Sequence, residues 1–168
     1  MKSRQIAVLL LLTLPMAVVF CKPQQITSGQ QTAKEAAVKK LLDSRRYRFV
    51  PQTMQTQSGR SIQVNNHFLD LRNDTLVSAL PYFGVSRSPE LGNSRGPLDF
   101  TSTGFSYSSE IRRKGNTLIS IRLNDRFIDA QELYVNVSST GYANVRARFN
   151  NRQSVSFFGD IRALPAKR

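Results

Sequence analysis

Apolar and polar residues alternate one by one over much of the chain after Arg46, and this two-residue period constrains the fold more than any other feature. In one stretch Ile119, Ile121 and Leu123 alternate with polar residues. Successive side chains of a β-strand point to opposite faces, so the pattern predicts strands with one buried face and one face in water. Similar alternation recurs at residues 47–49, 133–137, 145–149 and 155–157.

Short turn-forming sequences separate these stretches, which favours antiparallel neighbours. They lie at residues 58–60, 73–74, 114–116 and 150–151. Strands do not alternate with helices as they would in a parallel sheet. We therefore predict an α+β fold that is mainly antiparallel β, with about eight strands in a curled sheet or barrel. Five aromatic residues are expected to fill its interior: Phe49, Phe68, Phe105, Phe149 and Phe157.

Two proline-containing segments refine this prediction. Pro51 interrupts the first strand, and because proline has no N–H to donate to a neighbour, we expect this strand at an edge of the sheet. Residues 81–99 contain three prolines and three glycines, which predicts a long loop. Alternation then resumes over residues 100–111.

A single helix is expected before the strands. Thr32 is suited to the N-cap, and Glu35 three residues later completes a capping box. Over residues 33–44 apolar side chains such as Val38 and Leu42 recur at three- and four-residue spacing. This spacing predicts an amphipathic helix of about three turns that lies on an edge or face of the sheet.

Residues 1–21 have the layout of an export signal. Lys2 and Arg4 precede an apolar run of about 15 residues that ends at Cys21, shorter than the ~20 residues of a membrane-spanning helix. In one interpretation Cys21 is the lipid-carrying residue of a lipobox, although Phe20 stands where Gly, Ala or Ser is usual. In another, a signal peptidase cuts after Cys21, and an uncleaved anchor fits the short run less well. We expect an exported lipoprotein of the periplasm or outer membrane.

The rest of the chain is expected to form one domain. Residues 22–31 have the composition of a flexible tether, and residues 32–168 have the length of a single mainly-β domain. The 24 basic residues exceed the 11 acidic ones, giving a formal charge of +13, which favours an anionic envelope component as partner. Nucleic acid is not expected after export. One His and one Cys argue against a Cys/His zinc site and a disulfide framework, and no cofactor is predicted.

The most distinctive local sequence opens the long loop. In a functional interpretation its two aromatic side chains supply contact area at an interface or at the mouth of a cavity. In a structural interpretation, which we favour, Pro81 fixes a turn, Phe83 plugs the end of the sheet and Gly84 adopts a left-handed conformation. The candidate binding loop comprises Pro81, Tyr82, Phe83 and Gly84.

Several other polar residues are candidate site residues. Arg152 is a candidate anion contact, although the Asn and Gln beside it equally suit a turn. His67 is expected to be solvated, because no orienting carboxylate lies on its face of the strand. The carboxylates Asp125, Asp129 and Glu132 surround one turn, but their spacing matches no EF-hand loop. No catalytic or metal-binding set is predicted.

Two motifs resemble a known bacterial family. They are Leu80-Pro81-Tyr82-Phe83-Gly84 with the loop after it, and Asn151-Arg152-Gln153-Ser154 leading to Gly159. Together they resemble domain of unknown function family 4251, whose members look like exported or lipid-anchored envelope proteins. The likeness runs from Ala36 to about Ile161, and a minor departure is Phe158, which lies near a position where Ser or Thr is expected. It implies envelope localisation and a single domain, but no chemistry.

Three functions are compatible with the sequence. A non-catalytic envelope protein would bind a partner protein or an envelope component through its strand edges, its loop or its basic face. A carrier would hold a small ligand inside a barrel. A hydrolase would need carboxylates brought together by the fold, and the sequence contains no spacing signature for one. Because bulky side chains are expected to fill the interior, the first function is preferred.

Overall fold

One helix and ten strands make up the part of the chain that the structure describes. This computed structural model describes residues 28–85 and 96–166, so the predicted export signal and Cys21 lie outside it. The elements are α1 (Ser28–Asp43), β1 (Arg46–Gln55), β2 (Ser61–Gln63), β3 (Phe68–Arg72), β4 (Thr75–Ala79), β5 (Asp99–Ser102), β6 (Phe105–Ile111), β7 (Thr117–Leu123), β8 (Ala130–Val137), β9 (Tyr142–Phe149) and β10 (Val155–Arg162). A 3-10 turn, Arg113–Gly115, joins β6 to β7.

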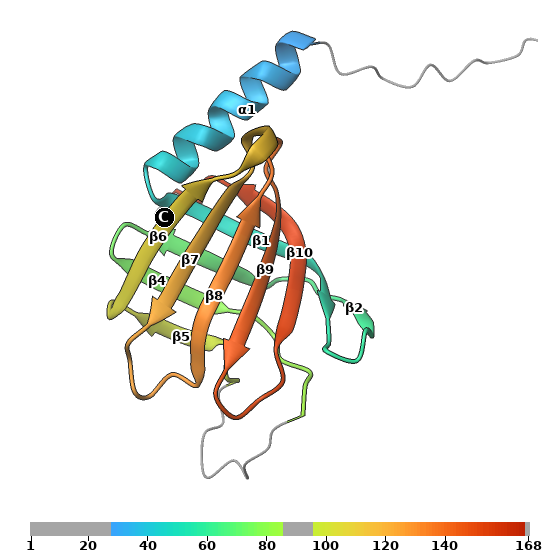
Figure 1. The fold of residues 1–168 in the computed structure, drawn as a ribbon, viewed down its shortest axis with the longest axis vertical. Helices are drawn as coiled ribbons and strands as arrows, with labels where there is room; N and C mark the ends of the chain where they lie inside the picture. The colour runs from blue at the N-terminus through green and yellow to red at the C-terminus, as the bar shows by residue number, and fades with distance from the viewer. Residues whose placement is uncertain (1–27, 86–95, 167–168) are drawn as a thin grey trace, which may run out of the picture.

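All ten strands belong to one antiparallel sheet that curls into a nearly closed barrel. Its order is β5-β4-β3-β1-β10-β9-β8-β7-β6, and β2 pairs with β1 beside this path. In Figure 1, β6 to β10 form the front layer, and β1, β3, β4 and β5 cross behind them. The pairing of β1 with β10 joins the two layers. The predicted fold class is confirmed, with ten strands instead of about eight; the segment from Asp99 to Ile111 forms two strands because it breaks at Thr103 and Gly104.

Bulky side chains fill the interior of the curled sheet. Tyr47, Phe49 and Met54 of β1 and Phe157 of β10 are each less than 2% exposed. They share one core with the inward-facing aliphatic residues of β7, β8 and β9, and with Phe149 at the end of β9. Interior packing of this kind removes most of the apolar surface of each side chain from water, which is the main stabilising term for the fold.

Two of the five phenylalanines expected inside are only half-buried. Phe68 lies on the outer face of β3 with Asp70, since residues two apart in a strand point the same way. The guanidinium of Arg48 stacks over its ring, 4.2 Å from the centroid. Phe105 points inward, but it belongs to β6 at the open end of the sheet and so remains partly exposed.

The expectation that Pro51 marks an edge strand is wrong. β1 lies inside the sheet, between β3 and β10. The register of the β1–β10 pair shifts between Pro51 and Thr53, and such a bulge is the other place where a strand accommodates proline. Pro51 faces Gly159, where a Cβ would overlap the carbonyl oxygen of Val50 and come within 2.8 Å of the Cα of Pro51. The two layers therefore meet through a backbone contact that only glycine permits.

The helix begins earlier than predicted, at Ser28, which includes the last residues of the expected tether. Thr32 therefore lies within α1 and is not its N-cap. Glu35 does not complete a capping box; its carboxylate accepts a hydrogen bond of 3.1 Å from the hydroxyl of Ser139 in the β8–β9 turn. The buried Val38 packs against Gly141 of the same turn. These contacts hold α1 across one end of the barrel (Figure 1). Among the described helices, none is long and apolar enough to span a membrane.

Candidate functional site

The sheet stays open between β5 and β6, the two ends of its strand order. The two-residue link Thr103-Gly104 joins these strands, but they do not pair with each other. Within the described chain β6 pairs with β7 alone, over all seven of its residues. Its other edge is therefore an unpaired strand edge along the open side of the barrel, between β5 and β6.

The hydrogen bonds at the two ends of the β6–β7 hairpin show which backbone groups face this edge. Arg112 N–H donates to the carbonyl of Asn116, and Asn124 N–H donates to the carbonyl of Gly104. In an antiparallel pair every second residue bonds to the partner strand. The pairs 106–122, 108–120 and 110–118 therefore bond across the hairpin. The N–H and C=O groups pointing away from β7 belong to four residues: Phe105, Tyr107, Ser109 and Ile111.

A groove runs along this open edge. Its lower part, about 490 Å³, lies between β6 and the β3–β4 turn at Asn73 and Asp74. Its upper part, about 630 Å³, lies between β6 and α1. Both parts are lined by Asp43, Arg45 and Tyr107, so they adjoin each other at these residues.

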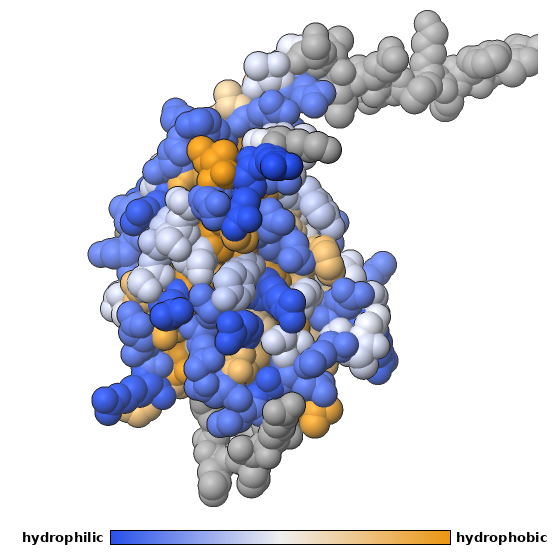
Figure 2. Space-filling view, in the orientation of Figure 1, coloured by the Kyte–Doolittle hydropathy of each residue, from blue (hydrophilic) through white to orange (hydrophobic). Residues whose placement is uncertain are grey.

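We call these two adjoining hollows together the seam groove. One wall consists of the four β6 residues whose backbone N–H and C=O groups point away from β7. The other wall consists of α1, chiefly Val38, Lys39 and Leu42, followed by Arg45. Figure 2 shows a small apolar area where the upper end of β6 meets α1, with hydrophilic residues around it.

The charged side chains of the seam groove have partners within the molecule. The guanidinium of Arg45 lies 4.5 Å from the ring centroid of Tyr107. Lys39 forms an exposed ion pair of 2.8 Å with Asp43. Ile111, whose side chain is 74% exposed, adds apolar surface to the upper part of the groove. The groove thus offers backbone hydrogen-bonding groups and apolar surface rather than a concentrated charge.

A buried phenol lies behind Tyr107. Tyr47 is 1% exposed, and its hydroxyl is the one buried side-chain polar atom without a hydrogen-bond partner among the described residues. Burial raises the pKa of Tyr47 well above its ordinary value, and the neighbouring Tyr107 raises it further. Burial also raises the pKa of Tyr107. Both phenols are therefore protonated at neutral pH, and neither is an activated base.

The candidate binding loop divides into one packed and one exposed aromatic residue. Tyr82 is half-buried: its ring stacks edge-on against Phe149 at 5.1 Å, and its hydroxyl donates to the carbonyl of Gln153 at 3.1 Å. Phe83, which we expected to plug the sheet, is 54% exposed. Tyr82 instead of Phe83 packs against the core at this end of the sheet. Its hydroxyl also forms a hydrogen bond to the backbone that a phenylalanine could not form.

Gly84 is required for a different reason from the one expected. Its φ is not left-handed, unlike those of Gly59, Gly115 and Gly141. A Cβ at position 84 would collide with the hydroxyl of Tyr82, so the residue is small because the Tyr82 ring folds back over it.

Arg152 lies beside this loop. Its guanidinium forms an ion pair with the carboxylate of Asp129 and lies 5.5 Å from the ring centroid of Tyr82. The side chain is 13% exposed. An external anion at Arg152 would therefore compete with Asp129, and whether one binds there stays a prediction.

The three carboxylates near the β7–β8 turn do not form one site. Asp125 caps the β7–β8 turn through the N–H of Phe127, and Asp129 pairs with Arg152. The carboxylate of Glu132 accepts from the hydroxyls of Ser120 and Tyr134 on the outer face of β8. The hydrogen bond from Tyr134 lowers the pKa of Glu132, despite its burial. Over residues 28–85 and 96–166 no three His, Cys, Asp or Glu side chains are placed to hold a metal ion.

His67 is not solvated as predicted. It is half-buried, and its Nδ1 lies 2.9 Å from the carbonyl oxygen of Ala79. This contact links the start of β3 to the end of β4, so His67 contributes to the pairing of the two strands.

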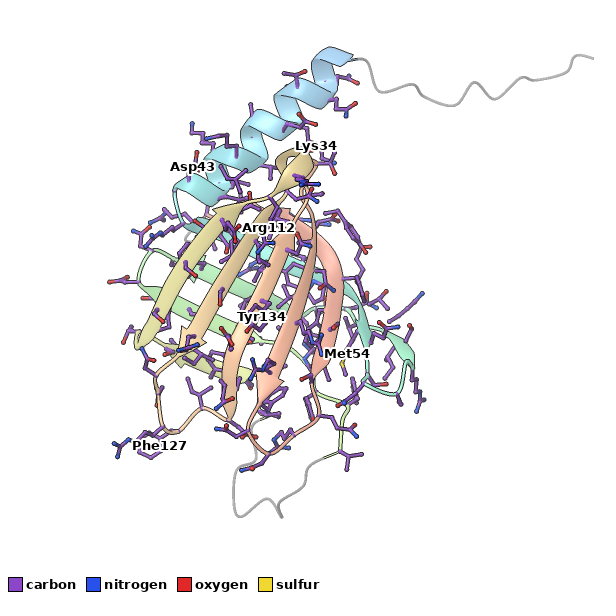
Figure 3. All side chains as sticks on the ribbon, viewed as in Figure 1. Lys34, Asp43, Met54, Arg112, Phe127 and Tyr134 are labelled. Carbon is purple, nitrogen blue, oxygen red and sulfur yellow. The ribbon has the colours of Figure 1, made fainter. Side chains whose placement is uncertain are left out.

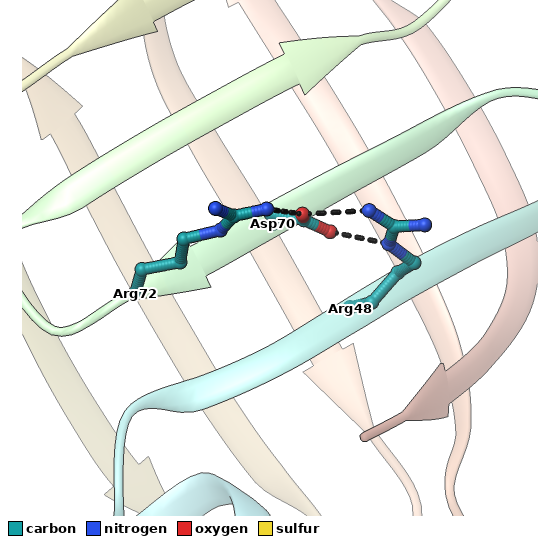
Figure 4. Close-up of polar contacts among 3 residues, drawn as sticks. All are labelled: Arg48, Asp70 and Arg72. Atoms are coloured by element: carbon teal, nitrogen blue, oxygen red, sulfur yellow. Dashed lines mark hydrogen bonds and ion pairs between the residues drawn. The ribbon is translucent and has the colours of Figure 1, made fainter. Parts of the chain in front are cut away.

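Sequence reasoning missed a buried carboxylate on the outer face of the rear layer (Figure 4). Asp70 of β3 is fully buried and accepts hydrogen bonds of 2.6 and 2.8 Å from Arg48 of β1 and 2.9 Å from Arg72. Burial would raise the pKa of Asp70, but the two guanidinium groups outweigh it and hold the pKa below its ordinary value. The alternation of side chains along β3 places Asp70 and Arg72 on the same face. Arg48 comes opposite Asp70 only through the pairing of β1 with β3, which the sequence does not reveal.

Comparison with known proteins identifies the family. None of the curated proteins compared with the chain matches it. A solved structure that resembles it is the crystal structure of a DUF4251 family protein from Bacteroides eggerthii. The TM-score is 0.60 at 17% sequence identity, and the match covers 80% of this chain and 92% of the other. At this identity the likeness establishes the fold alone. The model of the family called domain of unknown function DUF4251 matches residues 29–161, and the chain therefore belongs to this family.

Proposed function

We propose that this protein is a non-catalytic, exported component of the bacterial cell envelope that binds a partner protein or another envelope component on its outer surface. The observation that carries the proposal is the seam groove, where an unpaired strand edge lies beside exposed apolar surface. Contiguous apolar surface next to unpaired backbone is typical of interaction sites.

The packed interior supports a surface binder over a carrier. A carrier with a central ligand needs an internal cavity of several hundred Å³. Tyr47, Phe49, Met54 and Phe157 occupy the centre of this sheet with less than 2% exposure each. A ligand there would have to displace large side chains from a close-packed core, at a cost of several kcal/mol.

We further propose that Cys21 carries a lipid and that the α1 end of the barrel faces the membrane. Cys21 stands seven residues before Ser28, where α1 begins. Seven extended residues span at most about 25 Å. The seam groove would then open close to the membrane surface, within reach of other membrane-attached proteins.

Site-specific photo-crosslinking tests the binding surface in cells. A p-benzoylphenylalanine residue replaces Ile111 in the seam groove or, as a matched control, Phe127. Phe127 is 95% exposed and lies at the end of the barrel away from α1 (Figure 3). We expect a discrete crosslinked product from position 111 and none from position 127. Equal crosslinking at both positions, or none at 111, would contradict the proposal.

Metabolic labelling with an alkyne fatty acid tests the anchor. The full chain should incorporate the label and sediment with membranes, whereas Cys21→Ala should lose both properties. Gln25→Ala, four residues further on, serves as the control and should behave as the wild type. A label that persists in Cys21→Ala would rule out lipidation at this residue.

A further inference from the structure

The open edge of β6 presents a row of backbone groups with the spacing of a strand. Phe105, Tyr107, Ser109 and Ile111 each direct an N–H and a C=O away from β7. No described residue bonds to these groups. Alternate residues of a strand lie about 6.6 Å apart, so the row spans roughly 20 Å. The chemical group that matches donors and acceptors at this spacing is another extended polypeptide backbone.

The two ends of the sheet differ in how they are protected against such pairing. Edge strands are usually kept short, charged, bulged or interrupted by proline. β5 is four residues long. β6 is seven residues long, is regularly paired and contains no proline or lysine. Its one charged residue, Glu110, pairs with Arg112, and strand parity places it on the outer face, away from the seam groove. None of these four features protects the edge of β6, and a hollow of about 630 Å³ separates its upper half from α1.

We propose that the seam groove binds an extended segment of a partner polypeptide, which adds to β6 as an eleventh strand. This inference rests on the proposed binding function and assigns its site and the conformation of its ligand. Strand addition uses main-chain hydrogen bonds for affinity and pockets for alternate side chains for specificity.

The walls of the groove define the occupant. α1 stands opposite the upper half of β6, with Lys39 and Leu42 lining the groove. The hollow between α1 and β6 has a volume of about 630 Å³, which suits a single extended chain of five to seven residues rather than the sheet edge of a second folded copy. Alternate side chains of the bound segment face Leu42 and Tyr107 and should be apolar. The others face water.

The test is a selection of random twelve-residue displayed peptides on the full-length wild-type protein. We expect enriched peptides with alternating apolar residues. Their affinity, measured by fluorescence anisotropy, should fall at least tenfold for Ser109→Pro. Proline at position 109 removes one N–H that faces the groove and leaves the bonds to β7 intact. Ser108→Lys is the matched control, since this residue bonds to β7 and its side chain lies on the outer face.

A second measurement does not depend on how the variant folds. N-methylation of alternate backbone nitrogens of an enriched peptide removes one set of donors while leaving the protein unchanged. Methylation in one register should abolish binding, and methylation in the other should preserve it. A peptide whose affinity is insensitive to both registers does not bind as a strand, and this result would overturn the proposal.

The remaining outcomes separate this inference from the proposed function. If no peptide is enriched, or if enriched peptides bind Ser109→Pro as tightly as the wild type, strand addition is wrong. If crosslinking from position 111 persists in Ser109→Pro cells, the surface still binds its partner and only the mode is overturned. If the wild type is a dimer that Ser109→Pro converts to a monomer, the occupant is a second copy of this chain and the assignment to a partner polypeptide fails.

Discussion

Asp70 has an environment that is unusual for the outer face of a sheet, because its carboxylate is completely buried beneath side chains from its own layer. Arg48 and Arg72 lie on either side of it, and the ring of Phe68 stacks under Arg48. A buried carboxylate needs such partners, since removing one charge from water without compensation is very costly. The cluster therefore ties β1 to β3 from outside the core.

Replacing Asp70 tests this cluster. Asp70→Asn should lower the free energy of unfolding by about 3 kcal/mol at pH 7, because it leaves Arg48 without its buried countercharge. The folded-state pKa of Asp70 is lowered, so its contribution is present above the ordinary value of 3.8 and is lost as the pH falls through the folded-state pKa. The difference between variant and wild type should therefore shrink below about pH 4.

Urea denaturation across this pH range measures the difference. Asp74→Asn is the control, because Asp74 is exposed in the β3–β4 turn and the change should alter stability by less than about 0.5 kcal/mol. A difference for Asp70→Asn that stays constant down to pH 2 would show that the lost stability does not come from the charge.

The aromatic pair of the candidate loop should respond unequally to truncation. Tyr82→Ala removes the packing against Phe149 and the hydrogen bond to Gln153, and should cost about 2 kcal/mol. Phe83→Ala should change stability by less than about 0.5 kcal/mol, because the side chain is mostly exposed. Thermal unfolding followed by circular dichroism distinguishes them. Equal losses would mean that Phe83 packs where the structure leaves it in solvent.

At the scale of the elements, the β1–β10 pairing that joins the two layers depends on Gly159. Pro51 has no N–H to donate, the register shifts beside it, and the β1 backbone at Val50 and Pro51 lies directly against Gly159 of β10. Gly159→Ala should lower stability by about 3 kcal/mol, since the clash is with backbone atoms that cannot turn aside.

Gly104→Ala is the matched control for this prediction. It stands at the β5–β6 corner with open space around it and without a left-handed φ, so we expect a change of less than about 1 kcal/mol. Differential scanning calorimetry of both variants compares them directly. A Gly159→Ala protein as stable as the control would mean that the two layers can separate at this point without loss.

The strands could be predicted from the sequence because their inward-facing positions carry apolar residues, as Ile119, Ile121 and Leu123 do in β7. The position of β1 could not, because the glycine that accommodates Pro51 lies 108 residues later, where no local pattern connects them. Thr32 resembled an N-cap because the capping box is a local signal. The helix instead extends to Ser28, and Glu35 bonds to a turn more than 100 residues away.

At the scale of the whole molecule, an alternating sequence predicts a curled sheet but not whether that sheet closes. Closure depends on whether the last strand edges meet. Here Thr103 and Gly104 carry the chain from one layer to the other, and β5 and β6 do not pair. The seam groove was therefore out of reach of sequence reasoning, although its β6 wall, with Phe105, Tyr107 and Ile111, belonged to a predicted strand.

Hydrogen exchange of individual backbone amides, followed by NMR on the protein alone, tests the open edge most directly. The amides of Ser106, Ser108 and Glu110 bond to β7 and should exchange roughly 100-fold more slowly than those of Tyr107 and Ser109, which face the seam groove. Fast exchange at alternate residues of β6 is the predicted result. Uniform protection along β6 would contradict it, because the edge would then be paired and the groove closed.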